Sequence, residues 1–275
     1  MSNQEFKFAL NHMACPTLSP LEMLDMVAEL GIYAVELRND VRENSISDID
    51  QAHAIAKRAI TKGITVLSIN ALYPFNIWED ERAEQASHLA DLASASGAQM
   101  LVCCPLVSAG YDANDAERGE QLRVALRELR PILESKGLIG CIEPLGFPIS
   151  TLRFKADAIT AIHDIGGEGT FRLVHDTFHH RGAAETEMYA SMTGLVHISG
   201  VENTGISFDE MLDAHRLFVG PADRLDSVGQ VRQLLDTGYQ EYISFEPFAE
   251  DLWHQSDPAA AIKSCMDFVR EQLTI

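Results

Sequence analysis

Four short apolar segments in the second half of the chain each carry, at or near their end, a side chain that can ligate a divalent metal. These side chains are Glu143, Asp176, His197 and Glu246. Carboxylate and imidazole groups suit Mn²⁺, Mg²⁺, Co²⁺ or Zn²⁺, and the set contains no thiolate. A single acid at a strand end is more often a helix cap or an ion-pair partner. Three carboxylates held together would repel one another without a cation between them, so the group of four predicts one divalent metal ion.

The expected secondary structure explains how ligands so far apart in the sequence come together. Eight short apolar segments alternate with longer amphipathic ones. The predicted strands are Phe6 to Asn11, Ala34 to Leu37, Thr65 to Asn70, Met100 to Cys104, Ile139 to Glu143, Phe171 to Asp176, Leu195 to Ile198 and Tyr242 to Glu246. A closed barrel of eight parallel strands delivers every strand end to one face. We therefore predict a single α/β domain over residues 1–275, a (β/α)8 TIM barrel with its active site at the C-terminal ends of the strands.

Helices are expected between the strands, with glycine after each one. The predicted helices are Pro20 to Leu30 with Ser19 as N-cap, Asp48 to Lys62 with Ser47 in the capping position, Ala83 to Ser96, and Ala116 to Lys136. Pro131 lies inside the last of these, and proline removes a helical hydrogen bond. A kink or a division into two helices is therefore expected there.

Composition restricts the partners. The 275 residues, 46% of them hydrophobic, are close to the ~250 residues of a typical barrel. The 41 acidic and 21 basic residues give a net charge of −20, which repels phosphate backbones, so no nucleic acid partner is expected. The N-terminal segment Met1 to Glu5 lacks a signal-peptide pattern and no apolar run could span a bilayer, which predicts a cytoplasmic protein without a membrane partner. The five cysteines, without a CxxC pair, are expected to be free and buried.

The residues around the four ligands resemble a known superfamily. The matching segments are Cys141 to Gly146, Leu173 to His179, Val196 to Ile198 and Ser244 to Pro247. They are similar to the metal-ligand strand ends of the xylose-isomerase-like TIM barrels, which include sugar isomerases and epimerases, inosose dehydratases, hydroxypyruvate isomerases and the endonuclease IV group. Segments Asn70 to Asn76 and Val102 to Val107 are most similar to the 2-keto-myo-inositol isomerases. The resemblance extends from the first strand to the last.

The resemblance implies roles for individual residues. Glu143, Asp176, His197 and Glu246 would be the metal ligands, and the two glutamates would also be the catalytic proton-transfer pair. His179 would contact a substrate oxygen, or alternatively orient Asp176. Arg216 would contact substrate, with Arg224 as its rival, because the chain departs from the usual Pro-Gly of this loop at Val219-Gly220-Pro221. An exposed surface charge is the ordinary alternative for Arg216.

The implied reaction moves a carbonyl, or inverts a carbinol beside one, in a keto-inositol or keto-sugar. A proton must leave an unactivated carbon, so a divalent ion would stabilise the enediolate as a Lewis acid while a carboxylate acts as base. An inosose-dehydratase-type lyase and a hydroxypyruvate-isomerase-like activity are alternatives on the same site. A nuclease is disfavoured by the charge and by the lack of additional metal ligands. A barrel with a structural metal and no activity is the remaining alternative. Homo-oligomers, dimers or tetramers, are common in this superfamily.

Other loop residues are candidates for substrate contact. Asn70 ends the third predicted strand, and Tyr73, Phe75 and Trp78 follow in the loop from Ala71 to Asp80. The aromatic side chains would form a wall over a sugar or cyclitol ring, or pack onto the barrel rim.

Residues near other strand ends are interpreted from their neighbours. Trp253 and His254 could contribute to this site or to that of a neighbouring subunit. Glu36, beside Arg38 near the end of the second predicted strand, is expected to form an internal ion pair there, with a catalytic role as the alternative. His175 should point away from the site because strand residues alternate in direction, and the role of His12 is left open.

Overall fold

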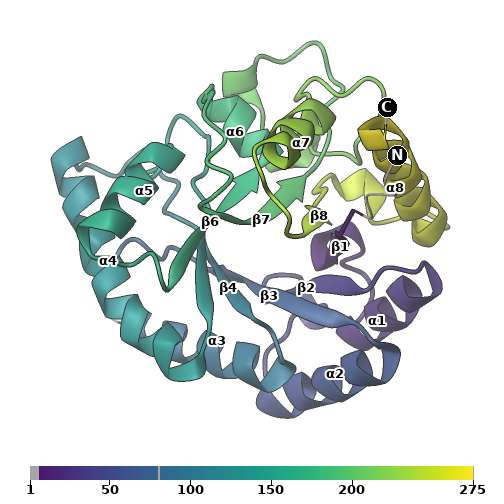
Figure 1. Cartoon of the computed structure of the whole chain (residues 1–275), viewed down its shortest axis with the longest axis horizontal. Coiled ribbons are helices and arrows are strands. Elements are labelled where there is room, and N and C mark those ends of the chain that lie inside the picture. Colours follow the sequence, from purple (N-terminus) through teal and green to yellow (C-terminus); the bar gives the residue numbers. More distant parts are fainter. Residues whose placement is uncertain (1–5, 80, 275) are drawn as a thin grey trace.

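The structure is a computed structural model that describes residues 6–79 and 81–274. Its strands form one closed parallel barrel in sequence order, with β8 paired to β1 (Figure 1). The strands are β1 (Phe8–Asn11), β2 (Ala34–Arg38), β3 (Thr65–Leu72), β4 (Met100–Cys103), β5 (Ile139–Ile142), β6 (Phe171–Asp176), β7 (Thr193–Ile198) and β8 (Ile243–Phe245). The predicted (β/α)8 barrel is confirmed. The expectations for Met1 to Glu5 and for Asp80 concern residues outside the described ranges.

Helices surround the barrel (Figure 1). They are α1 (Pro20–Glu29), α2 (Ile49–Lys62), α3 (Arg82–Ser96), α4 (Asp115–Lys136), α5 (Lys155–Asp164), α6 (Thr177–Ala183), α7 (Ser227–Asp236) and α8 (Pro258–Thr274). Ser19 caps α1 as predicted, whereas the cap of α2 is Asp48 and not Ser47. No helix in the described part of the chain is long and apolar enough to cross a membrane.

Helix α4 passes through Pro131 without dividing into two. Pro131 is on the exposed side, where water can hydrate the carbonyl group that loses its helical partner. Leu126, Leu129 and Leu133 are buried on the opposite side. Their packing against the barrel keeps the helix continuous, so of the two expected outcomes, a kink or a division, the division into two helices is wrong.

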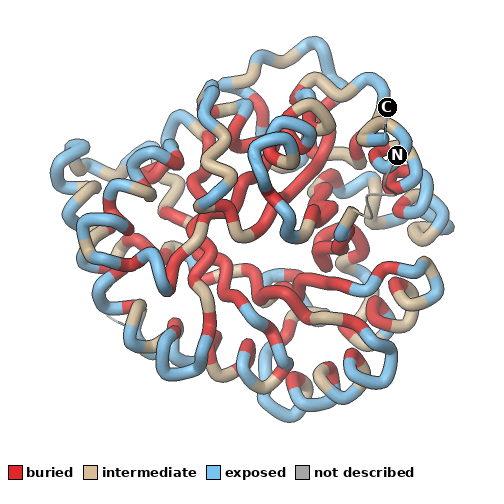
Figure 2. The backbone as a smooth tube through the Cα atoms, in the orientation of Figure 1, coloured by how far each residue is buried: buried red, intermediate tan, exposed pale blue. Residues whose placement is uncertain are grey.

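The apolar core has two parts, and Figure 2 shows buried residues along the strands and on the inner faces of the helices. The larger cluster fills the space between strands and helices, and a smaller cluster including Ala9, Ala34 and Val174 lies within the barrel. Alternation along β2 places Ala34, Glu36 and Arg38 on one side of the strand, which is the barrel interior. The interior therefore changes from apolar to charged toward the C-terminal ends of the strands.

Strand register brings the predicted ligands together at these ends. Asp176 pairs directly with His197 across β6 and β7, and His197 pairs with Ser244 across β7 and β8. Glu143 follows the last residue of β5 and Glu246 follows that of β8. Four neighbouring strands thus deliver the four candidate ligands to one point.

Candidate metal centre

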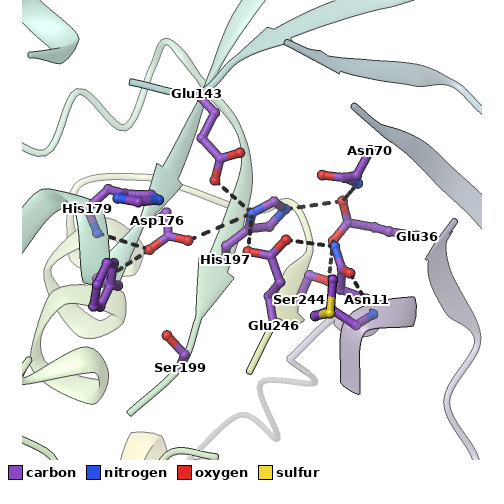
Figure 3. A network of polar contacts seen from close by, with 12 residues as sticks. Asn11, Glu36, Asn70, Glu143, Asp176, His179, His197, Ser199, Ser244 and Glu246 are labelled. Atoms are coloured by element: carbon purple, nitrogen blue, oxygen red, sulfur yellow. Dashed lines mark hydrogen bonds and ion pairs between the residues drawn. The ribbon is translucent and has the colours of Figure 1, made fainter. Parts of the chain in front are cut away.

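The four predicted ligands form a buried cluster at the barrel mouth (Figure 3). Glu143, Asp176, His197 and Glu246 each offer one ligand atom, and these atoms lie within 4.8 Å of one another. Three carboxylates and one imidazole form a donor set suited to a hard or borderline divalent cation. The residues therefore fit a single metal ion.

His197 lies between the carboxylates. Its Nδ1 is 3.1 Å from Glu143 Oε1, 3.1 Å from Glu246 Oε2 and 4.0 Å from Asp176 Oδ2. Burial acts to lower the pKa of His197, but the negative charges of Glu246, Glu36 and Glu143 outweigh it and raise this pKa well above its usual value. A metal ion bound here would take the place of the Nδ1 proton.

Two buried arginines balance the negative charge of the cluster. Arg216 Nη2 donates to Asp176 Oδ2 at 2.5 Å and to Glu246 Oε2 at 2.9 Å. Arg38 Nη1 donates to Glu246 Oε1 at 2.8 Å and its Nε donates to Asp40 Oδ1 at 2.7 Å. Although burial acts to raise the pKa of Glu246, His197 and Arg216 hold it at about 2. Glu246 is therefore a carboxylate at neutral pH.

Helix α6 fixes Asp176. Asp176 Oδ1 accepts hydrogen bonds from the backbone N–H groups of Phe178 at 2.7 Å and His179 at 3.1 Å, which caps the helix. Asp176 Oδ2 is then directed toward the candidate metal centre. The His179 ring lies edge-on to Phe147 and Phe178, with centroid distances of 5.0 and 5.1 Å. Its buried Nδ1 has no hydrogen-bond partner among the described residues. His179 thus has a polar atom free to bind a ligand.

Glu36 has a role that the sequence did not reveal. It is fully buried, and its Oε2 lies 3.1 Å from His197 Nε2, on the side of the ring opposite Glu143 (Figure 3). The expected ion pair with Arg38 is wrong, because Arg38 is one layer nearer the mouth and pairs with Asp40 and Glu246 instead. The other donors to Glu36 are Asn11, Ser68, Asn70 and Ser244.

These contacts determine which nitrogen of His197 faces the centre. Burial acts to raise the pKa of Glu36, yet His197 and the hydroxyl donors Ser244 and Ser68 hold it at about 2. A charged Glu36 keeps the proton on Nε2, so Nδ1 is the nitrogen available as ligand. Such outer partners of ligating histidines commonly raise metal affinity.

Glu36→Gln should weaken metal binding by about 10–100-fold. The amide has nearly the same shape, but it lacks the charge and can donate to Nε2, which would place the proton on Nδ1. Competition with a chelator would measure affinity, and circular dichroism would verify folding. Ser68→Ala is the matched control, because it removes another hydrogen bond to Glu36 without changing the His197 contact. A folded Glu36→Gln variant with unchanged affinity would contradict this role.

A cavity of about 390 Å³ opens beside the cluster. Both proton-transfer candidates, Glu143 and Glu246, line it together with four predicted substrate-binding residues, Asn70, Tyr73, His179 and Arg216. The other lining residues were not assigned to the site from the sequence: Arg38, Asn39, Asp40, Ala71, Cys104, Leu145, Phe147, Asp213 and Phe248. Arg38 ends β2 and its inward direction follows from alternation, so this signal was present in the sequence. The Cys104 thiol, 3.2 Å from Glu143 Oε2, gave no such signal.

The structure places the remaining aromatic candidates elsewhere. Trp78 lines a separate cavity beside α4 with Glu117 and Val124, and Phe75 is fully buried in the core. Trp253 and His254 line a neighbouring cavity. The aromatic residues of the third loop therefore do not form one wall.

Arg224, the rival of Arg216, donates to the carbonyl oxygen of Ile206 at 3.0 Å and does not line the cavity. His175 points outward, as alternation predicts, with Nδ1 3.0 Å from Lys155 Nζ. His12 lies with Nε2 2.8 Å from the carbonyl oxygen of Leu18. All five cysteines are free as predicted; four are buried and Cys104 is half-buried.

Comparisons with known proteins identify the family of this chain. Residues 24–272 match the xylose isomerase-like TIM barrel family. The chain belongs to this family. A xylose isomerase domain-containing protein from Salmonella typhimurium LT2 is 30% identical, with a TM-score of 0.89 and complete coverage of both chains. No functionally curated protein matches the sequence.

Solved structures of lower sequence identity share the fold. The IolI protein, solved with a bound zinc atom, is 20% identical, with a TM-score of 0.82 and coverage of 98% of this chain and 99% of that one. D-Psicose 3-epimerase from Clostridium cellulolyticum H10 is 14% identical, with a TM-score of 0.75 and coverage of 98% and 99%. At these identities the likeness establishes the fold alone.

Proposed function

We propose that this protein is a divalent-metal-dependent isomerase or epimerase of an unphosphorylated keto-sugar or keto-inositol. The observation that carries the proposal is that Glu143 and Glu246 combine two properties. Both belong to the cluster of candidate ligands, and both line the adjoining cavity. A substrate in that cavity would therefore meet two carboxylates next to the metal position.

The chain's own residues have distinct tasks in this proposal. Glu143, Asp176, His197 and Glu246 would hold the ion, which supplies Lewis-acid polarisation of a substrate carbonyl when bound. Glu143 and Glu246 would remove and return the proton on carbon. The low pKa of Glu246, about 2, keeps it a carboxylate at neutral pH, the form that would hold a cation. His179, whose Nδ1 has no partner among the described residues, would donate a hydrogen bond to a substrate oxygen that gains negative charge, and Arg216 would reach such an oxygen only with an N–H that its carboxylate partners leave free.

The charges of the cavity support a neutral substrate. Its two lining arginines already pair with carboxylates, Arg38 with Asp40 and Glu246, and Arg216 with Asp176, Asp213 and Glu246. A phosphate group would have to compete with these pairs. Two structural relatives, an L-ribulose 3-epimerase and a D-psicose 3-epimerase solved with D-tagatose, also favour ketoses.

Solvent deuterium uptake would test the proposal directly. The purified protein, loaded in turn with Mn²⁺, Co²⁺, Zn²⁺ or Mg²⁺, would be incubated in heavy water with a panel of inososes and ketoses. We expect exchange at a carbon beside the carbonyl of at least one compound, and its loss with chelator. The mass of the product would separate the two reactions, because isomerisation keeps the mass of the substrate and dehydration removes one water. No exchange in any metal-loaded sample would refute the proposal.

A further inference from the structure

A second cavity, of about 370 Å³, lies at the same end of the barrel. Segments that follow β1, β2 and β8 line it: Met13, Pro16, Thr17, Asp40, Val41, Arg42, Glu43, Glu250, Trp253 and His254. Asp40 lines this cavity and also the cavity beside the candidate metal centre. The segment after β8 likewise runs along both, with Phe248 in the first and Trp253 in the second. The two cavities are therefore neighbours with a shared wall.

The wall of the second cavity has the chemistry of a carbohydrate site. The half-buried indole of Trp253 offers a flat apolar surface for the C–H groups of a ring. The exposed carboxylates of Glu43 and Glu250 can accept hydrogen bonds from hydroxyl groups. Together with Asp40 they outnumber the single arginine, Arg42, so an anionic group such as a phosphate would be repelled.

Two local features indicate that this wall is adapted to a ligand. Arg42, a non-glycine residue, has a φ of 54°, and such strained conformations concentrate at functional sites. The indole N–H of Trp253 has no acceptor among the described residues. A buried unpaired donor is costly, so a ligand hydroxyl that accepted this hydrogen bond would stabilise the indole. Rotation of the indole toward such a hydroxyl would break no hydrogen bond of the free protein.

The shared wall is itself connected to the candidate centre. Both carboxylate oxygens of Asp40 accept hydrogen bonds from Arg38, at 2.7 and 2.8 Å, and Arg38 donates to Glu246 at 2.8 Å. A ligand that spans the two cavities would pass over Asp40. Its reacting part would then lie beside Glu246 while its other part rests on Trp253.

We propose that the second cavity binds an uncharged sugar ring joined by a glycosidic bond to the ring that reacts. The substrate class would then be keto-glycosides rather than free monosaccharides. The assignment of the reacting ring rests on the proposed function, whereas binding of the second ring does not.

The two tryptophans of the chain, Trp78 and Trp253, allow a binding test that needs no turnover. Trp78→Phe leaves Trp253 as the reporter, and Trp253→Phe leaves Trp78, which lines a different cavity. Each variant would be titrated with the unreactive glycosides maltose, lactose, sucrose and trehalose, and with glucose and myo-inositol. We expect at least one disaccharide to change the fluorescence of the Trp78→Phe variant with at least tenfold higher affinity than the monosaccharides, and no change in the Trp253→Phe variant.

Kinetics with oxidised, keto-containing versions of the bound disaccharide form the second arm. Trp253→Ala should raise KM for the keto-disaccharide at least tenfold more than for the corresponding keto-monosaccharide. Disaccharide binding without hydrogen exchange would support the second cavity and count against the proposed reaction. Hydrogen exchange in free ketoses without disaccharide binding would support the proposed reaction and count against the second cavity as a sugar site.

Three results would overturn the assignment. The first is equal affinity for mono- and disaccharides. The second is binding of glucosamine, titrated in the same way, without binding of any neutral sugar, which would mean that the carboxylates select a cation. The third is a Trp253→Ala variant whose sedimentation indicates a smaller assembly while disaccharide kinetics are unchanged, because a second copy of the chain would then cover this face.

Discussion

Glu143→Gln and Glu246→Gln are each expected to lower kcat by about 10²–10⁴-fold, the usual contribution of a positioned general acid or base. Glutamine keeps the size of the side chain and an oxygen able to contact a metal, but its amide cannot accept the substrate proton. Both residues line the cavity beside the candidate centre. The loss should therefore appear in the chemical step, with a smaller effect on folding.

The two variants also distinguish the two versions of the reaction. Inversion at one carbon needs groups on both faces of the substrate, so each single variant should still exchange deuterium from the face of its remaining glutamate. Proton transfer along one face needs one base on carbon, so only one variant should then lose deuterium exchange, and the other should lower kcat only through its part in holding the metal.

Both glutamates are also candidate ligands, so metal content must be measured in the same samples. Glu29→Gln on the exposed side of α1 is the matched control, because it changes the net charge equally and is remote from the barrel mouth. Undiminished exchange in a metal-loaded Glu143→Gln, Glu246→Gln double variant would exclude the proton-transfer roles.

The sequence predicted the barrel and the meeting of the four ligands because both follow from periodicity. Asp176 ends one predicted strand and His197 is the penultimate residue of the next, so parallel strand order already places them near each other, as their direct pairing in the structure shows. Glu36 was predicted less well because its partners depend on a local irregularity. The register of β2 and β3 shifts between Val35 and Glu36, which places Glu36 opposite Ser68. The sequence contains no sign of that bulge.

The third loop shows a second limit of prediction from sequence. Tyr73, Phe75 and Trp78 lie close together in the sequence, but a loop has no periodicity that would fix their directions. Side-chain hydrogen bonds decide instead: Asn76 donates to Thr151 Oγ1 at 2.8 Å and accepts from Leu106 N at 2.9 Å. These contacts anchor the loop between Tyr73 at the cavity and Trp78 beside α4.

Metal affinity is expected to rise about tenfold per pH unit across neutral pH, because binding must displace one proton from His197 Nδ1. The carboxylates of Glu246, Glu36 and Glu143 raise the pKa of His197 well above its usual value. Below that pKa the apoprotein holds the proton, so lowering the pH favours the proton over the metal. Above it the ring is neutral, no proton is displaced, and affinity should become independent of pH.

Calorimetric titration of the apoprotein with Mn²⁺ or Zn²⁺, in buffers of different ionisation enthalpy, would count the released protons. We expect about one released proton at neutral pH, from His197.

The Glu36→Gln substitution removes one of the charges that raise the pKa of His197. The metal affinity of this variant should therefore become independent of pH at a lower pH than that of the unsubstituted protein. His197→Gln has no such proton to release, and its weaker binding should vary little with pH. An affinity already constant from pH 6 to 8 in the unsubstituted protein would mean that His197 is neutral before the metal arrives. Such a result would contradict the placement of the imidazolium among three carboxylates as the feature that prepares this site for a cation.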